Sequence, residues 1–187
     1  MMSTPETDNE KLSLRGFIRV NLIDRKTGLV VSDTGYVPNK IQARGFQMMI
    51  CNPIAKSTAT CTNVSNPETT GWMPPNYMAI GSCTLTAIAS DNFSYFETQA
   101  GSAVSGGKCS ATPSFIATSE GGTIRFVGSW AGTSYLNASA DVGINAIALF
   151  QQSATNAVGM CAITYAASTW SSDQDVKATY ELRFSQT

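Results

Sequence analysis

Three short patterns in the chain match those that some serine enzymes use for acyl transfer. They are Ser105-Gly106-Gly107-Lys108, Ser90-Asp91-Asn92 and Lys26-Thr27-Gly28. That chemistry needs the serine at the start of a helix, so that the lysine lies one turn away, and needs Lys-Thr-Gly on a strand beside the site. In this chain the order is reversed, the serine lies in a glycine loop, and Lys26-Thr27-Gly28 fits a hairpin turn. We therefore predict turn structure and no catalysis at these patterns.

A glycine-rich stretch at residues 101–109 is similar to a phosphate-binding loop. The required G-x-x-x-x-G-K-[ST] spacing fails by one residue, and Cys109 stands where Mg²⁺ would need a hydroxyl. The sequence therefore predicts no nucleotide site and no phosphate site here.

Two pairs of carboxylates could bind a hard cation or act as an acid and a base: Asp24 with Asp33, and Asp173 with Asp175. Asx-turns and strand ends explain both pairs more simply. The chain has no histidine, which removes Ser-His and Cys-His nucleophile pairs and histidine metal ligands. We expect no catalytic, cofactor-binding or metal-binding residues, no cofactor, and a protein that is not an enzyme.

The five cysteines are an odd number without a C-x-x-C pair, which argues against a zinc site and a disulfide framework. We expect small buried side chains or loop thiols in a protein made in a reducing compartment. Residues 1–11 are polar and acidic, unlike a signal peptide, and no apolar stretch is long enough to span a membrane. The cysteines are Cys51, Cys61, Cys83, Cys109 and Cys161.

The composition of the 187 residues suits one domain whose surface is polar but poorly charged. Hydrophobic residues make up 43%, but charged residues only 13%, about half of the roughly 25% usual in soluble domains. A polar surface with so few charges indicates that much of it is covered by other protein in the working state. The net charge of −1 gives no broad field for nucleic acid or an anionic membrane. Seven of the twelve basic residues lie between Lys11 and Arg44, where we expect solvated faces of strands and a helix.

The first third predicts a hairpin followed by a helix. Residues 14–23 alternate, with Leu14, Ile18, Val20 and Leu22 on one face, which is typical of a half-buried strand. Residues 24–28 predict a turn with a left-handed glycine, and residues 29–37 a second strand. Pro38-Asn39 is expected to end that strand, and Asn39 to cap a short helix over residues 40–51.

The middle of the chain is irregular apart from two short predicted strands, at residues 77–83 and 93–99. Residues 52–76 and 100–113 are predicted loops rich in Ser, Thr, Asn and Gly. The aromatic group from Trp72 to Tyr77 suits either a sugar-binding or contact surface, or a loop that folds over the core.

The last third is the most regular. Residues 123–130 alternate, and residues 142–150 and 158–167 are apolar on both faces, as expected of central strands. In the closing strand, apolar residues 176, 178, 180, 182 and 184 alternate with polar residues 175, 177, 179, 181 and 183. We predict an all-β, two-layer antiparallel β-sandwich, jelly-roll-like, with one short helix and long loops. Residues 1–12 form a polar N-terminal arm, and residues 13–187 a single domain.

The order of these elements resembles structural proteins of tailed double-stranded DNA bacteriophages over residues 16–184. The resemblance is carried by the run from Asn39 to Ile50, Tyr77-Met78-Ala79-Ile80-Gly81-Ser82, Phe96-Glu97, residues 124–130, residues 143–150 and Leu182-Arg183-Phe184. Two places depart from the pattern. Asn145-Ala146 stand where the family often carries a Glu, and Thr98-Gln99-Ala100 replace a downstream Arg. The resemblance implies a β-sandwich used in the head, fibre base or tail, with no catalytic residues to carry over.

Composition and resemblance together predict a non-enzymatic virion structural protein, assembled in the host cytoplasm. The leading hypothesis is a capsid decoration or cement protein that contacts the major capsid protein as a homo-oligomer, with a trimer as the expected number. Residues 52–76, residues 100–113 and the N-terminal arm would make most contacts. The alternatives are a tail, baseplate or fibre-base protein, a carbohydrate- or receptor-binding module that uses Trp72 and Tyr77, and a hydrolase that uses a carboxylate pair.

Overall fold

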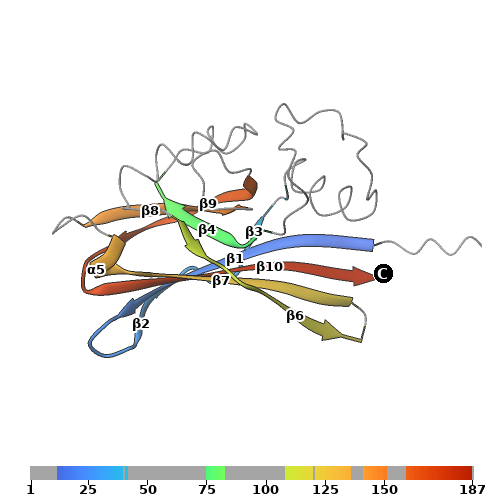
Figure 1. Cartoon of the computed structure of the whole chain (residues 1–187), viewed down its shortest axis with the longest axis horizontal. Helices are drawn as coiled ribbons and strands as arrows, with labels where there is room; N and C mark the ends of the chain where they lie inside the picture. Colours follow the sequence, from blue (N-terminus) through green and yellow to red (C-terminus); the bar gives the residue numbers. More distant parts are fainter. Residues whose placement is uncertain are drawn as a thin grey trace, which may run out of the picture.

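The fold is an antiparallel β-sandwich, seen in a computed structural model that describes residues 12–39, 41, 75–82, 108–119, 121–135, 141–150 and 159–186. Two sheets lie one above the other (Figure 1), which confirms the predicted fold class. The elements are β1 (Leu12–Asp24), β2 (Val30–Asp33), β3 (Val37–Asn39), β4 (Tyr77–Gly81), β5 (Lys108–Ser110), β6 (Pro113–Thr118), β7 (Gly121–Ala131), α5 (Gly132–Tyr135), β8 (Val142–Phe150), β9 (Gly159–Trp170) and β10 (Gln174–Gln186).

The larger sheet has six strands in the order β2-β1-β10-β7-β6, with β3 also paired to β1. At its centre β1 and β10 run antiparallel over their whole length, from Leu12 opposite Gln186 to Asp24 opposite Gln174. Figure 1 shows these two strands side by side, blue and red, with β4, β8 and β9 in the other layer. The first and last strands of the described chain therefore hold this sheet together.

The smaller sheet has four strands in the order β5-β4-β8-β9. The side chains from Ala146 to Phe150 on β8 are all buried, as expected of the central strand that residues 142–150 predict. The prediction of a central strand for residues 158–167 is wrong in the described part of the chain. There β9 pairs with β8 alone, and Ala166 and Ala167 are exposed.

The core lies between the sheets and follows the predicted alternation. Ile18, Val20 and Leu22 of β1 are buried, as are Val176, Ala178, Tyr180 and Leu182 of β10 and Phe126 and Trp130 of β7. They belong to one cluster with residues of the smaller sheet that include Met78, Ile80, Ile144, Leu149 and Cys161. Burying such side chains contributes roughly 1.5–3 kcal/mol each, so this shared core holds the layers together.

The predicted second strand is interrupted. Strand β2 ends at Asp33, Gly35 turns the chain with a φ of 64°, and β3 resumes at Val37. Pro38 does not end the strand as expected: it lies inside β3, opposite Phe17 of β1. Proline is compatible with such a position at the edge of a sheet, because its missing N–H can face away from the neighbouring strand. The predicted left-handed glycine at the first turn is confirmed, since Gly28 has a φ of 70°.

Two more local differences concern residues 100–118. The predicted loop at 100–113 contains β5 and the first residue of β6, and β6 as a whole was not predicted. The predicted strand at 93–99 lies outside the described residues. So do the predicted helix at 40–51 except for Ile41, the predicted loop at 52–76 except for Pro75 and Asn76, and most of the N-terminal arm. The helix that the structure describes, α5, has four residues. In the described part of the chain no helix has the length and hydropathy needed to cross a membrane.

Candidate interaction surface

The one acyl-transfer pattern that the structure describes in full is a turn. The Asp24 Oδ1 atom accepts hydrogen bonds from the Lys26 N–H (3.0 Å), the Thr27 N–H (2.7 Å) and the Thr27 hydroxyl (2.8 Å). Lys26, Thr27 and Gly28 are exposed. The predicted turn is therefore confirmed, while Ser90-Asp91-Asn92 and residues 101–107 lie outside the described residues.

The candidate carboxylate pairs are each held by other partners. Hydrogen bonds from Thr27 lower the pKa of Asp24, whereas Asp33 pairs with Arg19. Asp175 lies 3.3 Å from the Arg25 Nε atom and accepts a hydrogen bond from the Gly132 N–H. Asp173 accepts a hydrogen bond from the Ser171 hydroxyl. The described residues contain no group of three His, Cys, Asp or Glu side chains suited to a metal ion.

Glu181 is the unexpected polar residue of the structure. It lies at an outward position of β10, yet it is only 2% exposed. Its Oε1 atom accepts hydrogen bonds from the Tyr36 hydroxyl and the Arg125 Nε atom, both at 2.8 Å. Its Oε2 atom accepts two from Arg183, at 2.9 and 2.7 Å from Nε and Nη2. A carboxylate can stay buried in its charged form only when it is satisfied in this way.

The sheet register brings these groups together from distant parts of the sequence. Glu181 lies between Phe17 of β1 and Arg125 of β7, because both are its cross-strand neighbours. Tyr36 comes from the turn between β2 and β3. The Arg183 guanidinium carbon lies 4.2 Å from the centre of the Phe17 ring and 4.8 Å from that of Tyr36, within cation–π range. We call Phe17, Tyr36, Arg125, Glu181 and Arg183 the Glu181 cluster.

The electrostatics of the Glu181 cluster fix its protonation state. Burial raises the pKa of Glu181, but hydrogen bonds from Arg183, Tyr36 and Arg125 outweigh burial, so its pKa lies below the usual value. Burial, together with the hydrogen bond to Glu181, raises the pKa of Tyr36. At neutral pH Glu181 is therefore ionised and Tyr36 is protonated. A general acid or base needs a pKa near the working pH, and the pKa values of Glu181 and Tyr36 are both shifted away from neutral pH. The arrangement therefore suits hydrogen bonds that hold the strands together.

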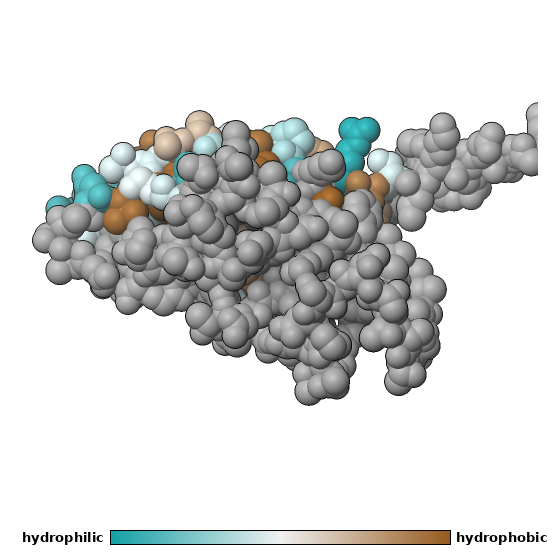
Figure 2. Space-filling model, turned by 90° about the horizontal axis from the view of Figure 1, so that it is seen from above, coloured by the Kyte–Doolittle hydropathy of each residue, from teal (hydrophilic) through white to brown (hydrophobic). Residues whose placement is uncertain are grey.

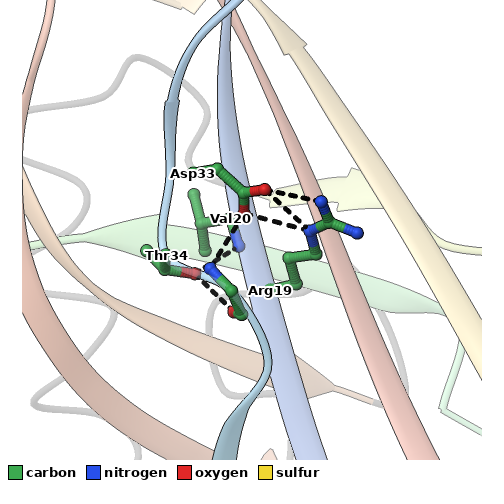
Figure 3. Close-up of polar contacts among 5 residues, drawn as sticks. Arg19, Val20, Asp33 and Thr34 are labelled. Atoms are coloured by element: carbon green, nitrogen blue, oxygen red, sulfur yellow. Dashed lines mark hydrogen bonds and ion pairs between the residues drawn. The ribbon is translucent and has the colours of Figure 1, made fainter.

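A second polar tie holds β2 to β1 at the sheet edge (Figure 3). The Arg19 Nε atom donates to Asp33 Oδ1 at 3.0 Å, and the same oxygen accepts a hydrogen bond from the Gly35 N–H at 2.8 Å. The Thr34 hydroxyl oxygen accepts from the Val20 N–H at 2.9 Å and donates to the Gly35 carbonyl. The hydrogen bond from Arg19 lowers the pKa of Asp33 to about 2. Both partners remain partly exposed.

Large apolar side chains reach the surface at the two outer strands of the six-stranded sheet. At β2 these are Leu29, Val30 and Val31, each more than half exposed, and on β6 they are Phe115 and Ile116. All six residues of β6 are exposed. Figure 2 shows hydrophobic surface, coloured brown, interspersed with intermediate (white) and hydrophilic (teal) surface on the part of the molecule that is coloured.

Sequence reasoning singled out neither the Glu181 cluster nor β6. The one local signal for the cluster is Glu181-Leu182-Arg183, which places a carboxylate and a guanidinium on the same face of a strand. Tyr77, half of the predicted aromatic surface, is partly buried on β4 opposite Phe150 and Ser110, whereas Trp72 lies outside the described residues.

Comparison with known proteins gave no match, whether to family models, to curated proteins or to solved structures.

Proposed function

We propose that this protein is a non-enzymatic structural component of a tailed bacteriophage virion. Within the virion we propose a head decoration or cement protein that binds the major capsid protein. The observation that carries the proposal is the two groups of exposed apolar side chains at opposite edges of the six-stranded sheet, one at β2 and one on β6. Exposed apolar surface at the rim of a stable sheet is typical of protein that is covered by other protein in its working state.

The low charge of the chain supports an assembly role. A buried Lys or Glu costs desolvation at a protein interface, so interface cores are depleted in charge. Strand β6 contains no charged residue, and at the β2 edge Leu29, Val30 and Val31 follow each other directly. Covering these side chains would stabilise a complex by roughly 25 cal/mol for each Å² of apolar surface removed from water.

The residues that carry the phage resemblance also support the proposal. Within the described part of the chain, all of them except Ile41 and Ser82 lie on β3, β4, β7, β8 and β10, so the resemblance concerns strands of both sheets. The assignment as a non-enzyme is supported by the chemistry of the described carboxylates. Asp24, Asp33 and Glu181 have lowered pKa values, which makes them poor proton donors at neutral pH.

Electron microscopy of particles tests the proposal. Particles of the virus that encodes this chain are purified with and without the gene, and antibody against the chain is used to label them. We expect label on the head surface of particles with the gene. Label along the tail or at its tip would replace the head assignment by a tail assignment. Particles that contain the gene but not the protein would refute a virion role.

Rebinding of purified protein to gene-deleted particles tests the exposed edges. We expect the wild-type chain to restore the head label and Val31→Asp to weaken it at least tenfold. Ser185→Asp is the control, because Ser185 is exposed on β10, away from both outer strands. Equal binding of Val31→Asp, Phe115→Asp and wild type would show that neither apolar edge contacts the particle.

A further inference from the structure

Strand β6 is an edge strand with a regular backbone. It pairs with β7 from Pro113 opposite Phe126 to Thr118 opposite Gly121, without a shift in register. Among the described strands, none pairs with the other side of β6. Its outward N–H and C=O groups therefore form a row that a further strand can pair with.

The opposite edge of the same sheet carries features that discourage such pairing. Strand β2 has four residues, its pairing with β1 shifts between Leu22 and Ile23, and Asp33 places a charge on it. Strand β3, which continues this edge, contains Pro38. Strand β6 has six residues and no charge, and its one proline, Pro113, is its first residue. Natural edge strands are usually protected by charge, bulges, proline or short length.

We propose that β6 pairs antiparallel with β6 of a second copy of this chain, about a two-fold axis perpendicular to the sheet. The six-stranded sheets of two copies then form one continuous sheet. This inference rests on the proposed assembly role, but it concerns the isolated protein in solution. Two-fold dimers are the commonest symmetric oligomers, and their interface uses the same surface patch on both copies.

The chemistry of β6 favours its own copy as the partner. A two-fold axis perpendicular to the sheet keeps the inner and outer faces of both copies aligned. With the axis at Phe115, Ser114 faces Ile116 of the other copy, and with the axis at Ile116, Phe115 faces Ala117. Like charges that face each other across paired strands destabilise the pair. Strand β6 has no charged residue, so neither register brings like charges together. If β2 paired with β2 of a second copy, the negatively charged Asp33 side chains of the two copies would lie close to each other.

Phe115 is already held in place for this contact. A Cβ atom added at Gly122 would lie 2.6 Å from two atoms of the Phe115 ring, so the ring lies directly on the backbone of β7. The residue is nevertheless 67% exposed. A large apolar side chain that is ordered before binding loses little conformational entropy when a partner covers it.

Sedimentation and native mass spectrometry across a range of protein concentrations test the pairing. We expect a dimer for the wild-type chain and at least a tenfold larger dissociation constant for Ile116→Lys, because it places like charges close to the axis. Val31→Lys is the matched control, since it adds the same charge at an exposed apolar residue of the other edge, and it should leave the dimer intact. Thermal unfolding of both variants checks that they are folded.

Charge pairing gives a second, more specific measurement. Ile116→Lys and Ile116→Glu should each be monomeric alone, and their mixture should form a heterodimer, since opposite charges then meet across the axis. A wild-type chain that stays monomeric at the highest concentration overturns the proposal. So does an oligomer that survives Ile116→Lys or that Val31→Lys abolishes instead. A β6 dimer found in a protein that is absent from virions would leave this inference standing and refute the proposed function alone.

Discussion

The Arg183 guanidinium and the Glu181 carboxylate, two residues apart on β10, form a side-by-side pair in which Nε and Nη2 lie 2.9 and 2.7 Å from one oxygen, Oε2. The other oxygen, Oε1, binds Arg125 of β7 and Tyr36 of the turn between β2 and β3. One carboxylate thus connects the middle of the six-stranded sheet with its edge.

Replacing Glu181 by Gln should destabilise the fold. The amide keeps an acceptor for Tyr36 but removes the negative charge that both arginines share. Breaking a buried ion pair costs about 3–5 kcal/mol. The side chains of Arg125 and Arg183 are 40% and 42% exposed, so solvent screens the loss, and we expect a decrease of about 2 kcal/mol in the free energy of unfolding. Urea denaturation at pH 7 measures it.

Asp33→Asn is the matched control for Glu181→Gln, because it removes a carboxylate from an arginine pair on the same face of the sheet. Both partners of that pair are partly exposed, so its loss should cost less than about 1 kcal/mol. Equal losses for the two variants would contradict the role given to the buried carboxylate.

Gly16→Ala should destabilise the contact between the two sheets. A Cβ atom at this position would lie 2.6 Å from the Tyr180 hydroxyl, which accepts a hydrogen bond from Asn39 and hydrogen bonds with Cys161. Overpacking of this kind costs about 1–3 kcal/mol. Gly143→Ala is the control, since nothing lies within 4 Å of its added Cβ. In the Tyr180→Phe background the cost of Gly16→Ala should fall, and an unchanged cost would refute the steric explanation.

Acid should unfold the protein through its carboxylates. The pKa values of Glu181, Asp24 and Asp33 all lie below their ordinary values of 4.5, 3.8 and 3.8, with Asp33 at about 2. Because lowered pKa values stabilise the fold above the unfolded-state pKa, the stabilisation is complete above pH 5 and is lost as the pH falls toward 2. Urea midpoints measured between pH 7 and pH 2 should follow this course. Asp33→Asn should flatten the lower part of the curve.

The two described cysteines should be unreactive in the folded protein. Burial raises the pKa of Cys109 to about 11 and that of Cys161 to about 12, and the thiolate is the reactive form. We expect N-ethylmaleimide at pH 8 to leave Cys161 unlabelled and to modify Cys109 slowly, as read by peptide mass spectrometry. Guanidinium should expose both. Rapid labelling of Cys161 without denaturant would contradict its position in the core.

The sequence allowed the sandwich to be predicted because alternation records which side chains face the core. Strands β1, β7 and β10 alternate cleanly, and their buried apolar side chains lie where the pattern places them; the exception to the pattern is the buried Glu181 of β10. Strand β6 was missed because its inner and outer residues are both exposed, so burial leaves no periodic trace in Pro-Ser-Phe-Ile-Ala-Thr.

The Glu181 cluster could not be predicted because its members come from four separate parts of the chain. Alternation gives Glu181 an outward position, and an outward glutamate is normally solvated. Its burial depends on the register that brings Phe17 and Arg125 beside it and on the turn at Gly35 that presents Tyr36. Apart from Arg183, two residues from Glu181, these partners are too distant in sequence to leave a local signal.

The pairing of β1 with β10 limits when the six-stranded sheet can fold. Leu12 faces Gln186, so β1 can pair with β10 only after all the other described strands have been made. Contacts of such long sequence separation form slowly, and an exposed apolar strand is prone to aggregate while it waits. Until β10 has been made, the apolar face of β1 lacks the neighbour that it has in the folded sheet.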